Sequence, residues 1–356
     1  MMKKQNRILW IDVLNVFACM SVLLLHSTNA EIHHFRGDIS FNWVIGLFTH
    51  SFFIWAVDVF FMLSGFTLIR RSLFCSMETV SDGLGGVKIF FFKRLKRLLI
   101  PVITWNILYM VVELAQQYKN GLAFESADVM IARFCSFDYN GHMWFFVPLV
   151  CLYLSIPFLA VFTLNSKRII LKLYIIISLI LCVISPLNSD FSVRSSIQDI
   201  FIFGSRFVVY AIAGYYFGNY DICYNSRIRI YRLGWLSAIV IFLGTALLSM
   251  YLPSHYKYFI TYTNLPCTLL AYSVFIFFRY TEWNKLIEKV NVKPSHVAVM
   301  SSLSLGVYLI QNMFFKVFSR IDLLKDNIIV TFILMYLICI LSVLFLKRIP
   351  IVKKIV

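Results

Sequence analysis

Four polar residues of the first apolar segment have the types and the spacing of a site that could move protons: Asp12, Asn15, Cys19 and His26. At about 100° per residue they fall within an arc of about 60° on a helix, with His26 about 21 Å above Asp12. A histidine can take a proton from a weak nucleophile and return it near neutral pH, because its ordinary pKa is about 6.5. The stripe therefore predicts His26 as a general base, with Asp12 and Asn15 acting towards a donor or in helix packing.

A run of basic residues forms the second candidate site. Residues 88–97 read K-I-F-F-F-K-R-L-K-R and bring together Lys93, Arg94, Lys96 and Arg97. Arginine and lysine side chains are suited to binding phosphate groups. The run could therefore hold a phosphate-bearing donor such as a coenzyme A thioester, or it could anchor the chain to anionic lipid headgroups.

No metal site is predicted. The eight cysteines contain no C-x-x-C pair, which argues against both a zinc site and a disulfide framework. His33 and His34 lie close to Glu31 in a polar loop, but adjacent histidines in a solvated loop are more often bystanders than metal ligands.

The elements that position these residues must be membrane-spanning helices. Of the 356 residues, 60% are hydrophobic and 14% are charged, whereas soluble domains have roughly 45–50% and 25%. This composition excludes a water-soluble globule and a disordered chain. A spanning helix needs about 20 apolar residues. We expect an all-α bundle of about ten such helices in a single domain over residues 1–356, without a soluble accessory domain. The predicted spans are 8–26, 43–69, 98–118, 143–163, 169–187, 200–218, 233–251, 258–278, 298–318 and 328–346.

The distribution of the basic residues predicts the orientation of the bundle. When alternate loops are assigned to opposite sides, about 24 of the 33 lysines and arginines fall on the side of the two chain ends. Because such residues collect on cytoplasmic loops, both termini are predicted to be cytoplasmic. The net charge of +16 is then mainly a topology signal, and nucleic acid is not an expected partner.

Several polar side chains fall inside the predicted spans, where they are energetically costly. An ionisable side chain in a spanning helix costs at least about 2.5–3.5 kcal/mol on insertion scales, so it usually faces a cavity or a partner. The polar and aromatic residues placed in the middle or outer part of the spans are His50, Asp58, Glu113, His142, Trp144, Arg206, Gln311 and Asn312. They predict a wet cavity open to the outer face, where His50, Glu113 and His142 could orient His26. Trp144 could stack on a sugar or anchor at the interface, and Glu113 could instead pair with Arg206.

Five segments resemble motifs of the membrane acyltransferase 3 family and follow one another in the family's order. Together they extend over nearly the whole chain. The first helix has Asp12, Asn15, Ala18 and His26 at the spacing of the family's first helix, and four more segments are similar to its later motifs. Those are Asp58-Val-Phe-Phe-Met-Leu-Ser64-Gly65-Phe66, the basic run Phe92–Arg97 followed by Pro101, His142-Met-Trp144-Phe145 with Tyr153 and Pro157, and Ser304-Leu-Gly-Val-Tyr308-Leu-Ile-Gln311.

The resemblance implies an O-acyltransferase of a bacterial plasma membrane. Members of the family move acyl groups, commonly acetyl, from cytoplasmic acyl-CoA to a hydroxyl of an extracytoplasmic polysaccharide or lipid-linked glycan. The roles carried over are catalytic for His26, Asp12 and Asn15, donor-binding for Lys93, Arg94, Lys96 and Arg97, and substrate-binding for His142, Trp144, His50, Glu113 and Gln311. The expected partners are membrane lipid, acetyl-CoA and the glycan, and the chain could form a homo-oligomer.

Two positions depart from the family pattern. Asn15 stands where the family usually has arginine, and Gln311 stands where it often has histidine. Both changes replace a cation or potential cation with a neutral amide, which can still donate a hydrogen bond. A step that needs a positive charge at either position would have to use another residue.

Two other functions remain compatible with the sequence. Polar groups inside the spans would also suit a transporter or flippase for glycans or small solutes, although the two related halves typical of such proteins are not found. The chain could also be a scaffold or a degenerate acyltransferase that lost activity with the arginine at position 15. For His26 itself, the alternative is that it has no catalytic role. Its side chain would then reach the membrane–water interface, above a polar contact between two helices.

Overall fold

The computed structural model describes residues 7–33, 35, 37, 39–69, 80–184, 207–262, 264–318, 321, 327–350 and 352–355. Over these ranges the chain is helical and contains no β-strand, and seven helical stretches are long and apolar enough to cross a membrane. They are Leu9–Ser27, Phe41–Leu68, Gly85–Lys119, Met143–Asn165, Tyr224–Tyr251, Pro294–Phe318 and Ile328–Leu346. The predicted all-α, polytopic membrane architecture is confirmed.

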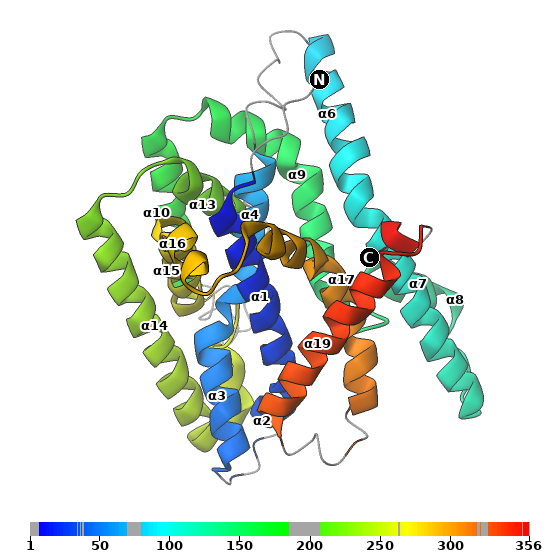
Figure 1. Cartoon of the computed structure of the whole chain (residues 1–356). Coiled ribbons are helices and arrows are strands. Elements are labelled where there is room, and N and C mark those ends of the chain that lie inside the picture. Colours follow the sequence, from blue (N-terminus) through cyan, green and yellow to red (C-terminus); the bar gives the residue numbers. More distant parts are fainter. Residues whose placement is uncertain are drawn as a thin grey trace.

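The helices are numbered as in Figure 1. In chain order they are α1 (Leu9–Ser27), α2 (Asn29–His33), α3 (Phe41–Phe53), α4 (Trp55–Leu68), α6 (Val80–Phe90), the π-helical turn η1 (Phe91–Leu95), α7 (Lys96–Lys119), α8 (Ala127–Cys135), the 3₁₀ turn η2 (Met143–Phe145), α9 (Phe146–Asn165), α10 (Arg168–Ile184), α13 (Val208–Asn219), α14 (Tyr224–Tyr251), the 3₁₀ helix η3 (Pro253–Tyr258), α15 (Leu265–Tyr280), α16 (Trp283–Lys289), α17 (Pro294–Phe318), α19 (Ile328–Leu346) and the 3₁₀ turn η4 (Val352–Lys354).

The other three predicted spans correspond to shorter described helices. The spans 169–187 and 200–218 match α10 and α13 and also include residues outside the described ranges, among them Arg206. The span predicted over 258–278 begins later, at Leu265, with Pro266 in the first turn of α15. Proline favours the first helical positions because its missing N–H has no partner there anyway. The residues before it, predicted to be helical, are therefore free to form a loop.

Helix α1 lies in the middle of the bundle (Figure 1). It packs against α3, α4, α15, α17 and α19. Leu14, Ala18 and Leu23 are fully buried in these contacts. The polar stripe of α1 is therefore held among neighbouring helices.

Helices α4 and α13 touch through two glycines. A Cβ atom added to Gly65 would lie 1.9 Å from the carbonyl oxygen of Ala211, and one added to Gly214 would lie 2.0 Å from the carbonyl oxygen of Met62. Small residues let two helix backbones approach this closely in a membrane protein. The Ser64-Gly65-Phe66 motif thus has a packing role.

The second predicted span, 43–69, is broken in its middle. The stretch Phe41–Leu68 divides at Ile54 into α3 and α4. The indole N–H of Trp55 donates a hydrogen bond to the Phe52 carbonyl, at 2.8 Å, across the break. Ile54, at the break, lines a cavity.

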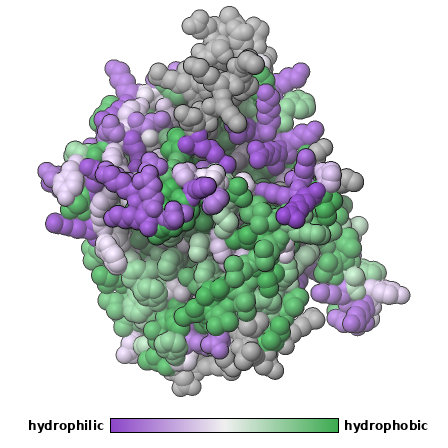
Figure 2. Space-filling view, in the orientation of Figure 1, coloured by the Kyte–Doolittle hydropathy of each residue, from purple (hydrophilic) through white to green (hydrophobic). Residues whose placement is uncertain are grey.

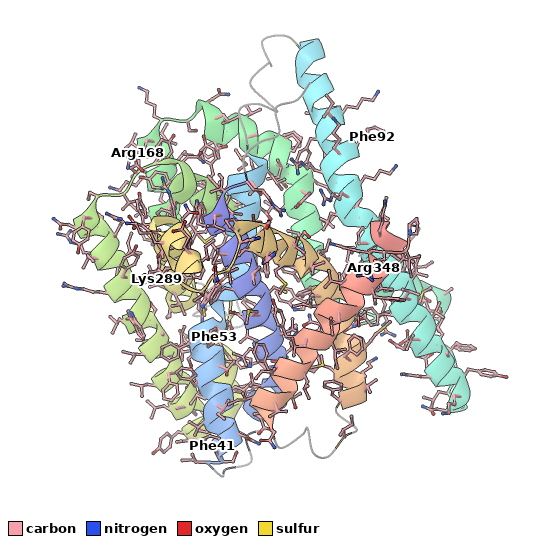
Figure 3. The ribbon with its side chains drawn as sticks, in the orientation of Figure 1. Phe41, Phe53, Phe92, Arg168, Lys289 and Arg348 are labelled. Carbon is pink, nitrogen blue, oxygen red and sulfur yellow. The ribbon has the colours of Figure 1, made fainter. Side chains whose placement is uncertain are left out.

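Polar residues gather at one end of the molecule. Figure 2 shows a band of hydrophilic residues beside a broad hydrophobic belt. Arg168, Lys289 and Arg348 come from two connections and from the segment after α19. All three lie farther from Phe41 than Phe53 does, and Arg168 lies farthest (Figure 3). The topology prediction assigns these three segments to one side, and we call the end of the bundle away from Phe41 the basic end.

Candidate active site

His26 is oriented by a residue of α17. It lies in the last turn of α1, and its Nδ1 atom is 3.1 Å from Oε1 of Gln311. Gln311 is fully buried. Because an amide oxygen only accepts hydrogen bonds, Nδ1 must carry the proton and Nε2 keeps its lone pair. His26 therefore presents Nε2 as a proton acceptor.

A second imidazole touches the first one. The rings of His26 and His142 are 3.9 Å apart between centroids and lie nearly perpendicular, at 82°. Nδ1 of His142 is 3.2 Å from Oδ1 of Asn140, which also accepts a hydrogen bond from Asn312. The Tyr308 hydroxyl donates to the carbonyl of His142, at 2.6 Å. His142 is thus fixed in place, also with its Nδ1 as the donor.

The electrostatic surroundings keep His142 neutral. It lies just before the membrane-spanning stretch that begins at Met143. Burial, together with the positive charge of Lys316, lowers the pKa of His142 to about 4. A neutral His142 does not oppose a proton arriving on His26, whereas a charged one would repel it.

These histidines line a cavity of about 480 Å³. We call it the outer cavity, after the side on which the sequence predicts it. Its walls include His26, His50, His142, Trp144 and Tyr262. The rings of Trp144 and Tyr262 are stacked, with centroids 5.4 Å apart and an interplanar angle of 30°. Four of the predicted site residues therefore line one cavity. Gln311 does not line it but bonds to Nδ1 of His26.

Two polar lining residues from one segment are among those that the sequence analysis did not single out. Tyr262 and Lys257 come from the segment between α14 and α15. Most of this segment fell inside or next to the span predicted over 258–278, which concealed it. The signal that could have revealed it is the density of polar residues and tyrosines before Pro266.

Asp12 and Asn15 lie towards the basic end, as their spacing from His26 predicts. The Asn15 amide donates to the carbonyl oxygen of Ser301, at 2.8 Å, and to the hydroxyls of Ser301 and Ser304. Asp12 forms an ion pair with Arg7, at 3.2 Å. In the described structure both residues make contacts that hold the start of α1.

A basic cavity of about 710 Å³ lies at the basic end. Three of the four predicted donor-binding residues, Lys93, Lys96 and Arg97, line it. Arg94 is exposed on η1 and is not among the lining residues. Most of the basic run that the sequence predicts to bind a donor therefore lines a cavity.

Helix α17 connects the surroundings of the two cavities. Ser302 and Leu305 line the basic cavity, and Gln311 bonds to His26 at the outer cavity. The six residues from Leu305 to Gln311 correspond to about 9 Å of helical rise. Along the helix axis, the basic cavity and the hydrogen bond to His26 are separated by about this rise, and Val307, Leu309 and Ile310 between them are buried.

Glu113 lies apart from both cavities. Its carboxylate pairs with the Arg133 guanidinium of α8, at 2.7 Å, and Glu125 joins the same arginine at 2.8 Å. Hydrogen bonds from Arg133 to these two carboxylates raise the pKa of the arginine. The described surroundings give Glu113 a structural partner, whereas its predicted substrate-binding role has no contact to support it.

The comparisons with known proteins give one match. A sequence model described as an acyltransferase domain, that of the acyltransferase 3 family, matches residues 8–347. No curated protein and no solved structure matches the chain. The match covers nearly the whole chain, including both cavities up to Lys347. The chain therefore belongs to the acyltransferase 3 family, and it is a polytopic membrane protein of that family.

Proposed function

We propose that the protein transfers an acyl group, acetyl in the first instance, from cytoplasmic acyl-CoA to a hydroxyl of an extracytoplasmic cell-surface glycan. The observation that carries this proposal is the position of His26, which is oriented by Gln311 and lines the outer cavity. In this assignment the basic end and both chain termini face the cytoplasm of a bacterial cell, and the chain acts as one domain.

The acceptor would bind in the outer cavity. Its volume of about 480 Å³ falls within the range of about 300–1,000 Å³ that is typical of ligand pockets. The stacked pair of Trp144 and Tyr262 offers an aromatic face beside His26 and His142. Such a face suits the apolar side of a sugar ring, while imidazole nitrogens suit its hydroxyls.

The chemistry would need one base. Nε2 of His26 takes the proton of the acceptor hydroxyl as the hydroxyl oxygen attacks the thioester carbonyl carbon. The carbon–sulfur bond breaks, and the proton passes from His26 to the departing sulfur. The products are an ester on the sugar and free coenzyme A. Gln311 keeps Nδ1 protonated throughout, so that Nε2 remains the atom that exchanges the proton.

The donor would bind at the basic cavity. Lys93, Lys96 and Arg97 line it and can hold phosphate groups. The acyl-bearing arm of coenzyme A would then extend along α17 towards His26. This arrangement needs no positive charge at position 15, where Asn15 instead bonds α1 to α17.

The test uses membranes from cells that express the chain, incubated with acetyl-CoA labelled on the acetyl group and with the host's surface glycans. We expect label that is released by mild base to appear on glycan, and membranes from cells without the gene serve as the control. Glycan movement across the membrane without any acyl donor, in place of labelling, would support a transporter and contradict the proposal.

Gln311 gives a prediction about orientation. We expect Gln311→Leu to lower kcat about 10- to 100-fold, because losing one buried hydrogen-bond partner costs about 1–3 kcal/mol. The KM for the donor should not change, since the basic cavity is untouched. Gln311→Glu keeps an accepting oxygen and should retain more activity than the leucine variant. Equal activity of the two variants would show that Gln311 does not orient His26.

Glu113 gives a prediction of a small effect. We expect Glu113→Gln to leave kcat within about twofold, because the carboxylate binds Arg133 and lies outside both cavities, and partly exposed ion pairs contribute only about 0–1 kcal/mol. The melting temperature should fall by no more than about 2–4 °C. Arg133→Gln also leaves kcat within about twofold, but it should lower the melting temperature more than Glu113→Gln, because Arg133 binds Glu125 and the Asp138 carbonyl as well. A large rise in the KM for the glycan acceptor in Glu113→Gln alone would restore the substrate-binding role.

A further inference from the structure

The basic cavity has walls from more than the predicted basic run. Lys93, Lys96 and Arg97 form one wall, and two further lysines line it from the C-terminal part of the chain, Lys347 at the end of α19 and Lys353 on η4. No lining residue of this cavity is acidic. Five cationic side chains from distant parts of the sequence thus surround one space.

The C-terminal wall is held in place by hydrogen bonds. The Lys347 ammonium group donates to the carbonyl oxygen of Ser302, at 2.7 Å. The indole N–H of the buried Trp105 in α7 donates to the carbonyl oxygen of Ile355, at 2.8 Å. The backbone N–H of Lys353 donates to the Ile349 carbonyl, at 2.9 Å. These bonds attach the C-terminal turn to α7 and position its lysine at the cavity.

Within the described residues, no carboxylate forms an ion pair with the charges around the cavity. The ion pairs that the described residues do form involve other arginines and lysines. Partial burial, and next the charge of Arg97, lower the pKa of Lys347. Like charges held this close repel each other, so the arrangement favours an anion that carries several charges.

Topology alone does not require this arrangement. Basic residues that set the orientation of a membrane protein need only lie in cytoplasmic loops, whereas Lys347 is partly buried and bonded across the cavity to α17. Lys353 also lies beyond residues 8–347, which match the family. Of the two C-terminal lysines, Lys347 is therefore the last residue of the match and Lys353 lies outside it.

We propose that Lys347 and Lys353 complete a binding site for a phosphate polyanion, a group with at least two phosphates, in the basic cavity. The inference rests on the proposed function, in which that group is the nucleotide end of the acyl donor with its pyrophosphate and ribose phosphate. The same chemistry occurs in anionic lipid headgroups that carry more than one phosphate. Lys347 and Lys353 act as binding residues for the ligand and take no part in proton transfer.

The experiment measures ligand binding, so that it does not depend on acyl transfer. The full chain is purified into nanodiscs of neutral phosphatidylcholine, and coenzyme A is titrated by calorimetry. We expect Lys347→Gln and Lys353→Gln each to weaken binding about tenfold, the value of one charge-assisted hydrogen bond. Lys347→Arg and Lys353→Arg keep the charge and should bind nearly as well as the wild type.

Arg348→Gln is the matched control. It removes the same charge from the adjacent residue, which is exposed and does not line the cavity, and should change affinity by less than about twofold. Adenosine 3′,5′-bisphosphate should bind with the same dependence on Lys347 and Lys353, whereas adenosine monophosphate should bind more weakly. Melting curves of all variants check that they are folded.

The outcomes separate the inference from the proposed function. If coenzyme A binds and neither glutamine variant weakens it, the inference is wrong and the donor assignment stands. If coenzyme A does not bind, but native mass spectrometry in cardiolipin-containing nanodiscs detects a lipid that both glutamine variants lose, the polyanion site stands and the nucleotide donor is wrong. If neither coenzyme A nor cardiolipin depends on the two lysines, the inference is overturned.

Discussion

Loss of acyl transfer is the expected result of His26→Ala. A positioned acid–base residue contributes about 10²- to 10⁴-fold to a rate, and we expect kcat to fall by that factor. The described part of the outer cavity also contains the imidazoles of His50 and His142. The His142 ring is bonded to Asn140, and we expect neither histidine to replace His26. The measurement is the initial rate of labelled acetyl transfer to glycan at saturating donor.

Two controls make this result interpretable. His26→Gln keeps a side chain of similar length and guards against collapse of the cavity, and it should be as inactive as the alanine variant. His296→Ala changes an exposed histidine at the other end of the bundle, near the start of α17, and should keep wild-type activity. Coenzyme A binding should be unchanged in both His26 variants. Full transfer by a folded His26→Gln protein would contradict the base assignment.

The largest effect on stability is expected at the contact between α4 and α13. In Gly65→Ala the new Cβ would lie 1.9 Å from a backbone oxygen of Ala211, and in Gly214→Ala it would lie 2.0 Å from one of Met62. A backbone atom cannot move aside as a flexible side chain can, so the two helices must separate. We expect each variant to lose about 3 kcal/mol or more, the upper range for overpacking.

The measurement is the thermal melting of the detergent-solubilised protein followed by gel filtration. Gly85→Ala is the matched control, because a Cβ there meets nothing within 4 Å, and its helical position should tolerate alanine. A Gly65→Ala protein that melts together with Gly85→Ala would show that the helices do not approach as closely as described.

The sequence predicted the features that depend on neighbouring residues in the chain. The apolar stretches of most spanning helices are visible directly because the bilayer sets a minimum length for them. The shared face of Asp12, Asn15 and His26 also follows from helical periodicity alone. His142 could be named as a neighbour of His26 only from its depth in the membrane, and the ring contact is a finding of the structure.

The features that escaped prediction depend on contacts between distant segments. Arg133, the described partner of Glu113, lies in the short helix α8, which is too short for a search over 20-residue apolar windows to find. The roles of Lys347 and Lys353 could not be predicted, because nothing in the sequence shows that the chain end folds back onto α7. The closeness of Gly65 to Gly214 likewise depends on which two helices meet.

The neutral bond between Asn15 and Ser301 has a consequence for an energised cell. Moving one elementary charge across a full membrane voltage of 100 mV involves about 2.3 kcal/mol, so a charged side chain at this depth of α1 would feel part of that voltage. An amide has no net charge for the voltage to act on. The attachment of α1 to α17 through Asn15 should therefore be equally strong in cells with a membrane voltage and in cells whose membrane voltage has collapsed.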